Sequence, residues 1–239
     1  MMFKRVAVIG GSGAIASALI QHLSEDSNAK IYVFSQHDIL FQSKNIEAHK
    51  INYLNEKSIS NSAELASKDG DLDLVIITNG ILHNENVQPE KSLKDLSISK
   101  FNEVFLVNTI IPSLIAKYFL PKLNKSSRSV MSFLSARVGS ISDNRLGGWY
   151  SYRSSKAALN MIIKNLSIEL ARLNGEGIVV GLHPGTVESR LSSPFSSNVP
   201  KDKLFSPSFA AMKLMEVLSN LDKGTTGRVY GWDGKEITP

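Results

Sequence analysis

The chain has 239 residues and a hydrophobic content of 42%, enough for one α/β domain with a full core. It contains no cysteine, which excludes disulfides, thiolate metal sites and cysteine nucleophiles. The formal net charge of +5 comes from scattered lysines and arginines without a basic block, so it indicates a solvated surface rather than a nucleic-acid site. A basic surface also attracts an anionic cofactor.

A strand, a glycine turn and a helix are expected at the start of the chain. Residues 4–10 form a short β-branched run typical of a buried strand. The turn Gly10-Gly-Ser-Gly13 follows, and residues 14–20 have the pattern of a helix. Free N–H groups and the positive end of the helix dipole form an anion site in such a turn. The same turn also fits a βα connection without a ligand, so the anion site is a hypothesis.

Strand-like and helix-like runs alternate along the rest of the chain. We expect strands at 30–34, 45–51, 72–77, 129–134, 177–183 and 227–231, and helices at 55–68, 99–124, 150–174 and 207–221. Pro112 predicts a kink or a break in the second of these helices. The βαβα order predicts an α/β Rossmann-type fold, a doubly wound parallel sheet with helices on both faces. Ligand is expected beyond the carboxyl ends of the strands.

Two stretches bear on location and access. Residues 187–208 are rich in serine and proline without clear periodicity, which predicts a substrate-side loop, either a lid or a locally disordered segment. Residues 101–123 form the most apolar long run, but Asn102, Glu103 and Lys117 within it favour a buried helix over a membrane span. Glycine and serine interrupt the apolar N-terminal run early, unlike a signal peptide. We therefore expect a cytoplasmic protein with no membrane partner.

A tyrosine and a lysine four residues apart carry the main catalytic signal. Tyr152 and Lys156 share one face of the helix expected at 150–174. The ammonium is expected to stabilise a tyrosinate and to lower the pKa of Tyr152 from its ordinary value of about 10. Such a tyrosine exchanges a proton with a carbonyl or alcohol oxygen while hydride moves. With six tyrosines in a lysine-rich chain, the spacing also fits a solvated helix face.

Several ordered motifs resemble those of the short-chain dehydrogenase/reductase family over nearly the whole chain. They are Gly139-Ser-Ile, Asn144, Gly147-Gly148, the run Tyr150 to Asn160, the run Leu182 to Val187, and Trp232-Asp-Gly234. Within the family the chain is most similar to C-factor and sniffer-type carbonyl reductases. The resemblance implies that residues 1–239 form a single dinucleotide-binding oxidoreductase domain with residues 187–208 on the substrate side.

The resemblance also implies roles for individual residues. Tyr152 is the proton donor, and Lys156 lowers its pKa and holds the nicotinamide ribose. Asn108 helps to hold a water relay behind the lysine, although a polar residue that bends the helix is the alternative. No metal is implied. The expected cofactor contacts are Gly10, Ser12, Gly13, Ala14, Ile15, Ser35, Gln36, Asn52, Asn79, Gly80, Tyr152, Lys156, Pro184, Gly185 and Val187.

The chain departs from the family pattern at the catalytic serine. The second serine of the family motif falls on Ala136, and losing one donor to a developing oxyanion typically costs about 10²–10³ in rate. Ser135 is the candidate catalytic replacement, but adjacent strand residues point to opposite faces, so it can substitute only if the strand end has turned. Ala14 and Ala16 replace glycines of the turn, and Thr78 replaces a sheet-stabilising asparagine.

The end of the second strand decides between NAD and NADP. An acidic residue there binds the ribose hydroxyl of NAD, whereas a nearby arginine accommodates the 2′-phosphate of NADP. Ser35-Gln36-His37 offers neither, and the missing carboxylate tilts the choice toward NADP. We expect an NAD(P)-dependent oxidoreductase that acts on a small carbonyl or alcohol substrate as a homo-oligomer. One alternative is a catalytically weakened dinucleotide-binding or signalling protein. Another is an epimerase or dehydratase, which is less favoured because no appreciable substrate domain is expected after residue 185.

Overall fold

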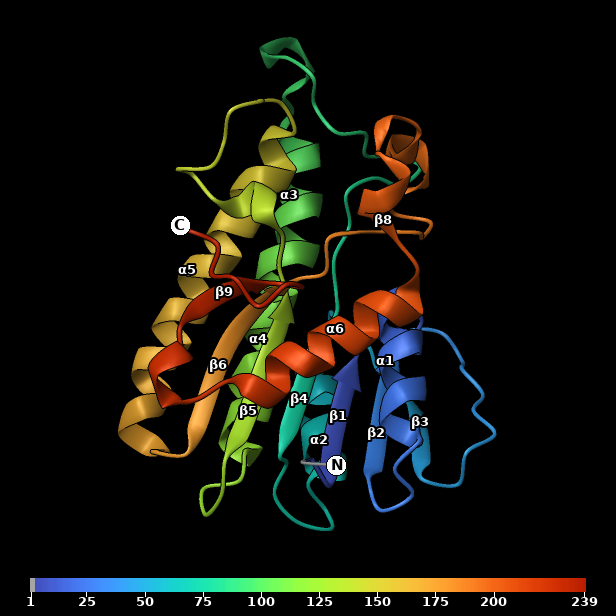
Figure 1. The fold of residues 1–239 in the computed structure, drawn as a ribbon, viewed down its shortest axis with the longest axis vertical. Coiled ribbons are helices and arrows are strands. Elements are labelled where there is room, and N and C mark those ends of the chain that lie inside the picture. The colour runs from blue at the N-terminus through green and yellow to red at the C-terminus, as the bar shows by residue number, and fades with distance from the viewer. Residues whose placement is uncertain (1–2) are drawn as a thin grey trace.

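A parallel sheet of seven strands forms the centre of the computed structural model, in the order β3-β2-β1-β4-β5-β6-β9 (Figure 1). The structure describes residues 3–239, without the side chains of residues 196–198 and 201. The strands are β1 (Arg5–Ile9), β2 (Lys30–Ser35), β3 (Ile46–Lys50), β4 (Leu74–Ile77), β5 (Ser129–Leu134), β6 (Gly177–His183) and β9 (Arg228–Gly231). The predicted doubly wound Rossmann-type sheet is confirmed.

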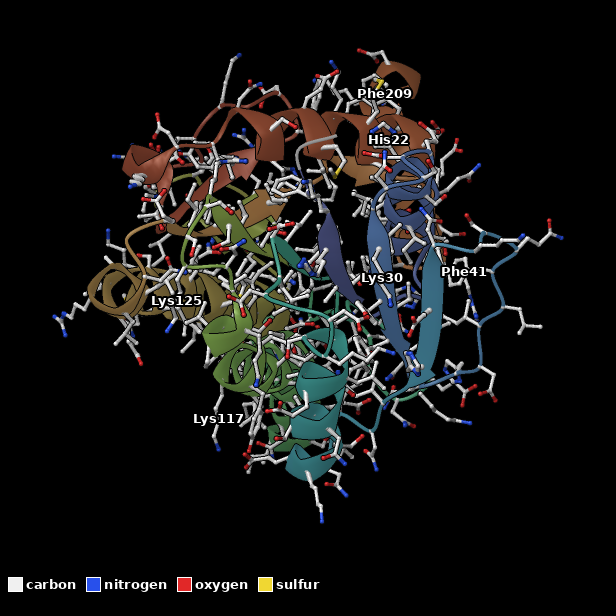
Figure 2. The ribbon with its side chains drawn as sticks, turned by 90° about the horizontal axis from the view of Figure 1, so that it is seen from below. His22, Lys30, Phe41, Lys117, Lys125 and Phe209 are labelled. Atoms are coloured by element: carbon white, nitrogen blue, oxygen red, sulfur yellow. The ribbon has the colours of Figure 1, made fainter. Side chains whose placement is uncertain are left out.

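Helices cover both faces of this sheet. One face carries α1 (Ala14–Ser24) and α6 (Pro207–Asn220), and the other carries α2 (Glu56–Ala66), α4 (Ile111–Phe119) and α5 (Tyr150–Leu173). In Figure 2, His22 and Phe209 lie on one side of the strands and Lys117 lies on the other. Each face packs on its own apolar cluster. The central strands are therefore buried on both sides, as their continuous β-branched runs predict.

The predicted helix at 99–124 is continuous but changes its winding. α3 (Ile98–Phe105) passes into a π-helical segment (Leu106–Ile110), which is followed by α4 and a 3₁₀ turn (Leu120–Lys122). Pro112 lies in the first turn of α4, so the change of winding directly before it takes the place of a break. In the described part of the chain one helical stretch, Ile98–Lys122, is apolar and long enough to cross a membrane, but half of its most apolar window is buried. It packs against α2 and α5 and is a core helix.

The segment predicted as a substrate-side loop contains more regular structure than its sequence pattern indicates. β7 (Thr186–Val187) and β8 (Leu204–Phe205) pair in parallel at its base, and 3₁₀ turns occupy Ser193–Asn198 and Lys201–Lys203 between them. The ring of Phe205 packs edge-on against Trp232, with centroids 4.6 Å apart. In Figure 1 the segment stands above the carboxyl ends of the strands, beside the loop that follows β4.

Candidate active site

The predicted site residues meet at the carboxyl edge of the sheet, where the strand order reverses. β2 and β3 lie on one side of β1, whereas β4, β5, β6 and β9 lie on the other. Open α/β sheets bind ligands in the crevice at such a point. The glycine turn follows β1, Gly80 follows β4, and Ala136 follows β5. Tyr152 and Lys156 reach the same edge from the first turns of α5.

Lys156 is buried at the centre of this edge. Its side chain donates a hydrogen bond from Nζ to the Leu134 carbonyl at the end of β5, at 2.8 Å, and the residue is 3% exposed. A Cβ atom on Gly80 would lie 3.3 Å from the same Nζ. Glycine at position 80 therefore leaves room for the Lys156 ammonium. Burial lowers the pKa of Lys156 to about 8, because removal from water disfavours the charged form.

Tyr152 packs against an apolar wall. Its cluster consists of Leu82, Ala136 and Tyr152 itself, extended by Val138, Trp149 and Phe195. Burial raises the pKa of Tyr152 to about 12, which is opposite to the predicted direction. The physical reason is that Nζ of Lys156 lies 6.0 Å from the centre of the Tyr152 ring and donates to Leu134 instead. In this arrangement the loss of hydration outweighs the attraction of the ammonium for a phenolate.

The two residues after β5 point to opposite sides, as strand alternation predicts. Ser135 is buried and donates its hydroxyl to Oδ1 of Asn160 on α5, at 2.6 Å. Ala136 instead lies in the wall beside Tyr152. The structure therefore brings the methyl group of Ala136, and not the hydroxyl of Ser135, into the apolar cluster of the site. A catalytic role for Ser135 stays a prediction that requires a turn of the strand end.

Asn108 lies in the π-helical segment and joins α5 to the loop that follows β4. Its Oδ1 accepts the Ile81 N–H at 2.7 Å, and its Nδ2 donates to the Ile81 carbonyl at 2.9 Å and to Ser155 Oγ at 3.0 Å. Ser155 donates in turn to the carbonyl of Tyr152 at 2.8 Å. Both ends of the Asn108 amide are thus engaged, and the relay role that the resemblance implies stays a prediction.

The glycine turn presents a helix N-terminus that no side chain caps. Gly13 is the N-cap of α1, so the backbone N–H groups of Ala14 and Ile15 in the first turn remain open to an anion. Directly after β4, Thr78 donates its hydroxyl to the Ile9 carbonyl at 2.7 Å. Thr78 therefore joins β4 to β1, the function expected of the family's asparagine.

The remaining predicted contacts surround this turn. Oδ1 of Asn79 is buried and has no hydrogen-bond partner among the described residues, which leaves an acceptor for a ligand. Ser35 accepts the His37 N–H at 3.1 Å with its hydroxyl, while Gln36 is exposed. Asn52 is exposed, and its Oδ1 accepts a backbone N–H two residues on at 3.0 Å. Gly10 and Ser12 lie in the turn itself, and Pro184, Gly185 and Val187 follow β6 at the start of the 187–208 segment.

Leu82, His83 and Phe195 lie at the candidate site but were not predicted from the sequence. Nε2 of His83 lies 3.2 Å from each of the carbonyl oxygens of residues 190 and 191, which joins the loop after β4 to the 187–208 segment. The Phe195 ring lies 5.3 Å from Trp149 and 5.5 Å from His83, and Trp149 lies 6.1 Å from Tyr152. These residues lie in loops without periodicity, so only the position of Leu82 directly after Ile77-Thr-Asn-Gly80-Ile could have indicated it.

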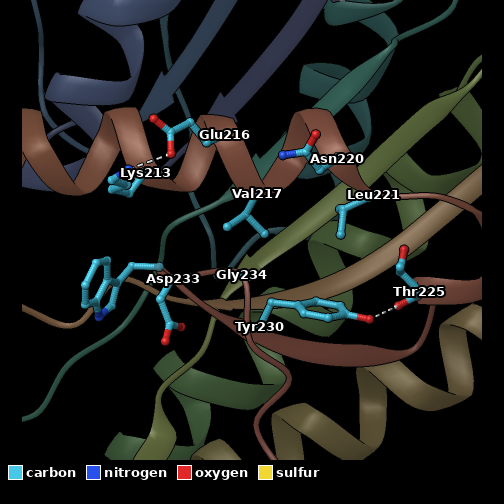
Figure 3. A pocket seen from close by; sticks show the side chains of 10 residues that line it. Lys213, Glu216, Val217, Asn220, Leu221, Thr225, Tyr230, Asp233 and Gly234 are labelled. Atoms are coloured by element: carbon cyan, nitrogen blue, oxygen red, sulfur yellow. Dashed lines mark hydrogen bonds and ion pairs between the residues drawn. The ribbon is translucent and has the colours of Figure 1, made fainter.

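A hollow with a volume of about 380 Å³ lies between α6 and the turn after β9, away from the candidate active site (Figure 3). Lys213 pairs with Glu216 at 2.7 Å on its α6 side, and Tyr230 donates to the Thr225 carbonyl at 3.3 Å on the other. None of the predicted catalytic or cofactor-binding residues lines it. This hollow is therefore separate from the candidate active site.

Comparisons with known proteins agree with the fold. The family model described as short chain dehydrogenase matches residues 4–200. The chain is 28% identical to 1-hydroxy-2-glutathionyl-2-methyl-3-butene dehydrogenase of Rhodococcus sp., over 96% of each chain, and 29% identical to the C-signal of Myxococcus xanthus, over 61% of this chain and 82% of that one. The NADPH-bound carbonyl reductase from chicken fatty liver has a TM-score of 0.85 at 23% identity, over 100% of this chain and 96% of that one, which shows the shared fold.

Proposed function

Because the chain belongs to the short chain dehydrogenase family, whose model matches residues 4–200, we propose that it is an NAD(P)-dependent oxidoreductase that interconverts a small carbonyl compound and its alcohol. One observation carries the proposal: the phenol of Tyr152 and the ammonium of Lys156 are buried side by side at the carboxyl edge of the sheet. Buried titratable groups with shifted pKa values in a crevice are candidates for acid–base chemistry.

The residues at this edge fit a dinucleotide. The open N-terminus of α1 offers backbone N–H groups to a pyrophosphate, and the buried Oδ1 of Asn79 offers an acceptor. Gly80 has no side chain to crowd Nζ of Lys156, which is the group that would hold the ribose. When bound, the nicotinamide coenzyme carries the hydride.

Tyr152 moves the proton in this proposal. In the direction of reduction, its phenol donates a proton to the carbonyl oxygen while the carbon accepts hydride, which leaves a tyrosinate. Lys156 has a pKa of about 8, so its ammonium form predominates at neutral pH and stabilises that tyrosinate. The high pKa of Tyr152 keeps the phenol protonated and ready to donate before substrate arrives.

The substrate that fits best is apolar and carries an aromatic ring. Leu82, Val138, Trp149 and Phe195 surround Tyr152 with aliphatic and aromatic side chains. Ala136 adds no hydrogen bond to the developing oxyanion, so Tyr152 is the main donor. Carbonyl compounds activated by electron-withdrawing groups need the least additional stabilisation, and we therefore propose an electron-poor aryl aldehyde or ketone.

A binding titration followed by a turnover assay tests the proposal. Fluorescence titrations with NADPH and NADH should show saturable binding, tighter for NADPH because no carboxyl group at Ser35 or Gln36 repels its 2′-phosphate. Reduction of 4-nitrobenzaldehyde should then be detectable and exceed that of cyclohexanecarbaldehyde. Tyr152→Phe should abolish turnover while coenzyme binding stays saturable. Binding without turnover of any carbonyl would favour the alternative that Ala136 motivates, a binding protein without catalysis.

We also propose a cytoplasmic homo-oligomer that associates through the helices of one face. Exposed apolar side chains on these helices support it, with Met161 61% and Ile168 46% exposed on α5 and Ile110 48% exposed before α4. Light scattering should give an oligomer, and Met161→Lys with Ile168→Lys should give a monomer. A monomeric wild-type protein would contradict the proposed assembly.

A further inference from the structure

The turn that leads into α5 is left-handed at three consecutive residues. Gly147 and Gly148 have φ of 63° and Trp149 has φ of 49°. Among the described residues, Trp149 is the one non-glycine residue with a positive φ. A bulky side chain is strained in this conformation and adopts it only where the surroundings hold it.

Glu90 contacts this turn with both its backbone and its side chain. Its carbonyl accepts the Trp149 N–H at 2.5 Å, and its Oε2 accepts the Ser151 N–H at 3.2 Å. Glu90 is fully buried, at 0% exposure, and its Oε1 has no partner among the described groups. A carboxyl group thus lies inside the protein against the N-terminus of α5, where the helix dipole favours negative charge. Trp149, the N-cap, cannot supply that acceptor from its own side chain.

The same turn sets the position of two rings in the site. The Trp149 ring lies 6.1 Å from the Tyr152 ring and 5.3 Å from the Phe195 ring. Tyr152 directly follows Ser151, whose N–H donates to the Glu90 carboxylate. Without the carboxylate, the Ser151 N–H has no acceptor and the first turn of α5 is free to fray. The bond from the Trp149 N–H to the Glu90 carbonyl alone then opposes relaxation of Trp149 to a negative φ, which would move its ring out of the wall.

We propose that Glu90 is a positioning residue, which caps α5 and holds the left-handed turn so that Trp149 and Tyr152 face the substrate. The catalytic part of this inference rests on the proposed function, because Tyr152 is the proposed proton donor. The structural part stands on the geometry of the turn alone. Glu90→Gln keeps an oxygen acceptor for Ser151, whereas Glu90→Leu fills the space without one. Glu85→Ala, at an exposed glutamate of the same loop, is the matched control.

Tryptophan fluorescence tests the structural part without any activity. The chain has two tryptophans, so Trp232→Phe leaves Trp149 as the single emitter. In this background Glu90→Leu should shift the emission to the red and raise the acrylamide quenching constant about twofold, because the half-buried Trp149 ring leaves the wall for water. Glu90→Gln and Glu85→Ala should match the parent. An emission that is unchanged in Glu90→Leu would overturn the proposal.

Kinetics with NADPH and 4-nitrobenzaldehyde test the catalytic part. Glu90→Leu should lower kcat about 10- to 100-fold, the effect of a misplaced reacting group, and leave the NADPH Kd within about twofold. Glu90→Gln should restore most of kcat, which a loss of general packing would not predict. A wild-type kcat in Glu90→Leu would overturn this part. No turnover by the wild-type protein would count against the proposed function, while the fluorescence result would still decide on Glu90.

A double variant keeps the test decisive if Glu90→Leu alone does not fold. Glycine adopts the left-handed turn without strain, so Trp149→Gly removes the need for a clamp. Glu90→Leu should therefore lower the melting temperature less in the Trp149→Gly background than in the wild type. Equal losses in the two backgrounds would overturn the proposal.

Discussion

Replacing Lys156 with methionine should stabilise the folded protein at neutral pH while it abolishes the proposed reaction. The pKa of Lys156 is about 8 in the folded protein against an ordinary value of 10.5. One pKa unit corresponds to about 1.4 kcal/mol, so holding the ammonium in this buried position costs about 3 kcal/mol below pH 8. Methionine loses the hydrogen bond to the Leu134 carbonyl, worth about 1 kcal/mol. The expected net gain in the free energy of unfolding is about 2 kcal/mol.

This gain should disappear at alkaline pH. Below pH 8 the folded and unfolded chains both bind the Lys156 proton, and the wild type bears the full cost. Between pH 8 and 10.5 the folded state releases the proton first, so the unfolded state binds more protons and wild-type stability rises with pH. The methionine variant lacks this contribution. The difference in unfolding free energy should therefore shrink by about 2–3 kcal/mol between pH 7.5 and pH 10.

Urea denaturation of both proteins across this pH range measures the difference. Lys164→Met on the exposed side of α5 is the matched control for the loss of a lysine from the same helix. Parallel pH profiles for wild type and Lys156→Met would refute the reasoning, because they would mean that Lys156 retains its proton as readily in the folded protein as in the unfolded one.

Three further changes test other parts of the site. Ala136→Ser should raise kcat with 4-nitrobenzaldehyde by about tenfold or more, because it adds a donor beside Tyr152; no increase would contradict the placement of residue 136 in the wall. Gly139→Ala should lower stability in urea by about 1–3 kcal/mol, because its Cβ would lie 2.9 Å from backbone and Cβ atoms of Lys156, whereas wild-type stability would argue against that close contact. Gln36→Asp should raise the NADPH Kd about tenfold or more and change the NADH Kd less in a fluorescence titration; equal changes would show that residue 36 does not face the 2′-phosphate.

The sheet could be predicted because its strands are continuous apolar runs that parallel pairing buries on both faces. Residues 30–34 and 129–134, for example, correspond closely to β2 and β5. The regular structure within residues 187–208 could not be predicted, because β7 and β8 have two residues each, too few to show an alternating hydrophobic pattern. The π-helical segment was missed for a different reason: Pro112 indicates a disturbed helix, but whether the helix breaks or rewinds depends on what Asn108 contacts on other elements.

The candidate site was predictable where its geometry is local. Tyr152 and Lys156 lie together because residues four apart share a helix face. The predicted direction of the Tyr152 pKa shift was wrong, because the shift depends on burial by Leu82 and Phe195, which come from loops distant in the sequence. The opposite orientations of Ser135 and Ala136 followed from strand alternation alone. The assignment of these residues to catalysis stays a prediction.

The first turns of α5 are held by groups from four separate parts of the chain. The Leu134 carbonyl at the end of β5 receives Nζ of Lys156, Asn108 in the π-helical segment binds Ser155, Gly139 packs on the helix backbone, and Glu90 accepts the Ser151 N–H. Glu90 lies in the loop after β4, and Asn108 lies in the helical stretch between β4 and β5. Leu134 is the last residue of β5, and Gly139 lies in the loop after it. The position of the proposed proton donor is thus set by the carboxyl edge of the sheet, the same edge that carries the open N-terminus of α1. Because the proposed proton donor and the open N-terminus of α1 share this edge, the sheet and its helices, rather than residues 187–208, fix their relative position.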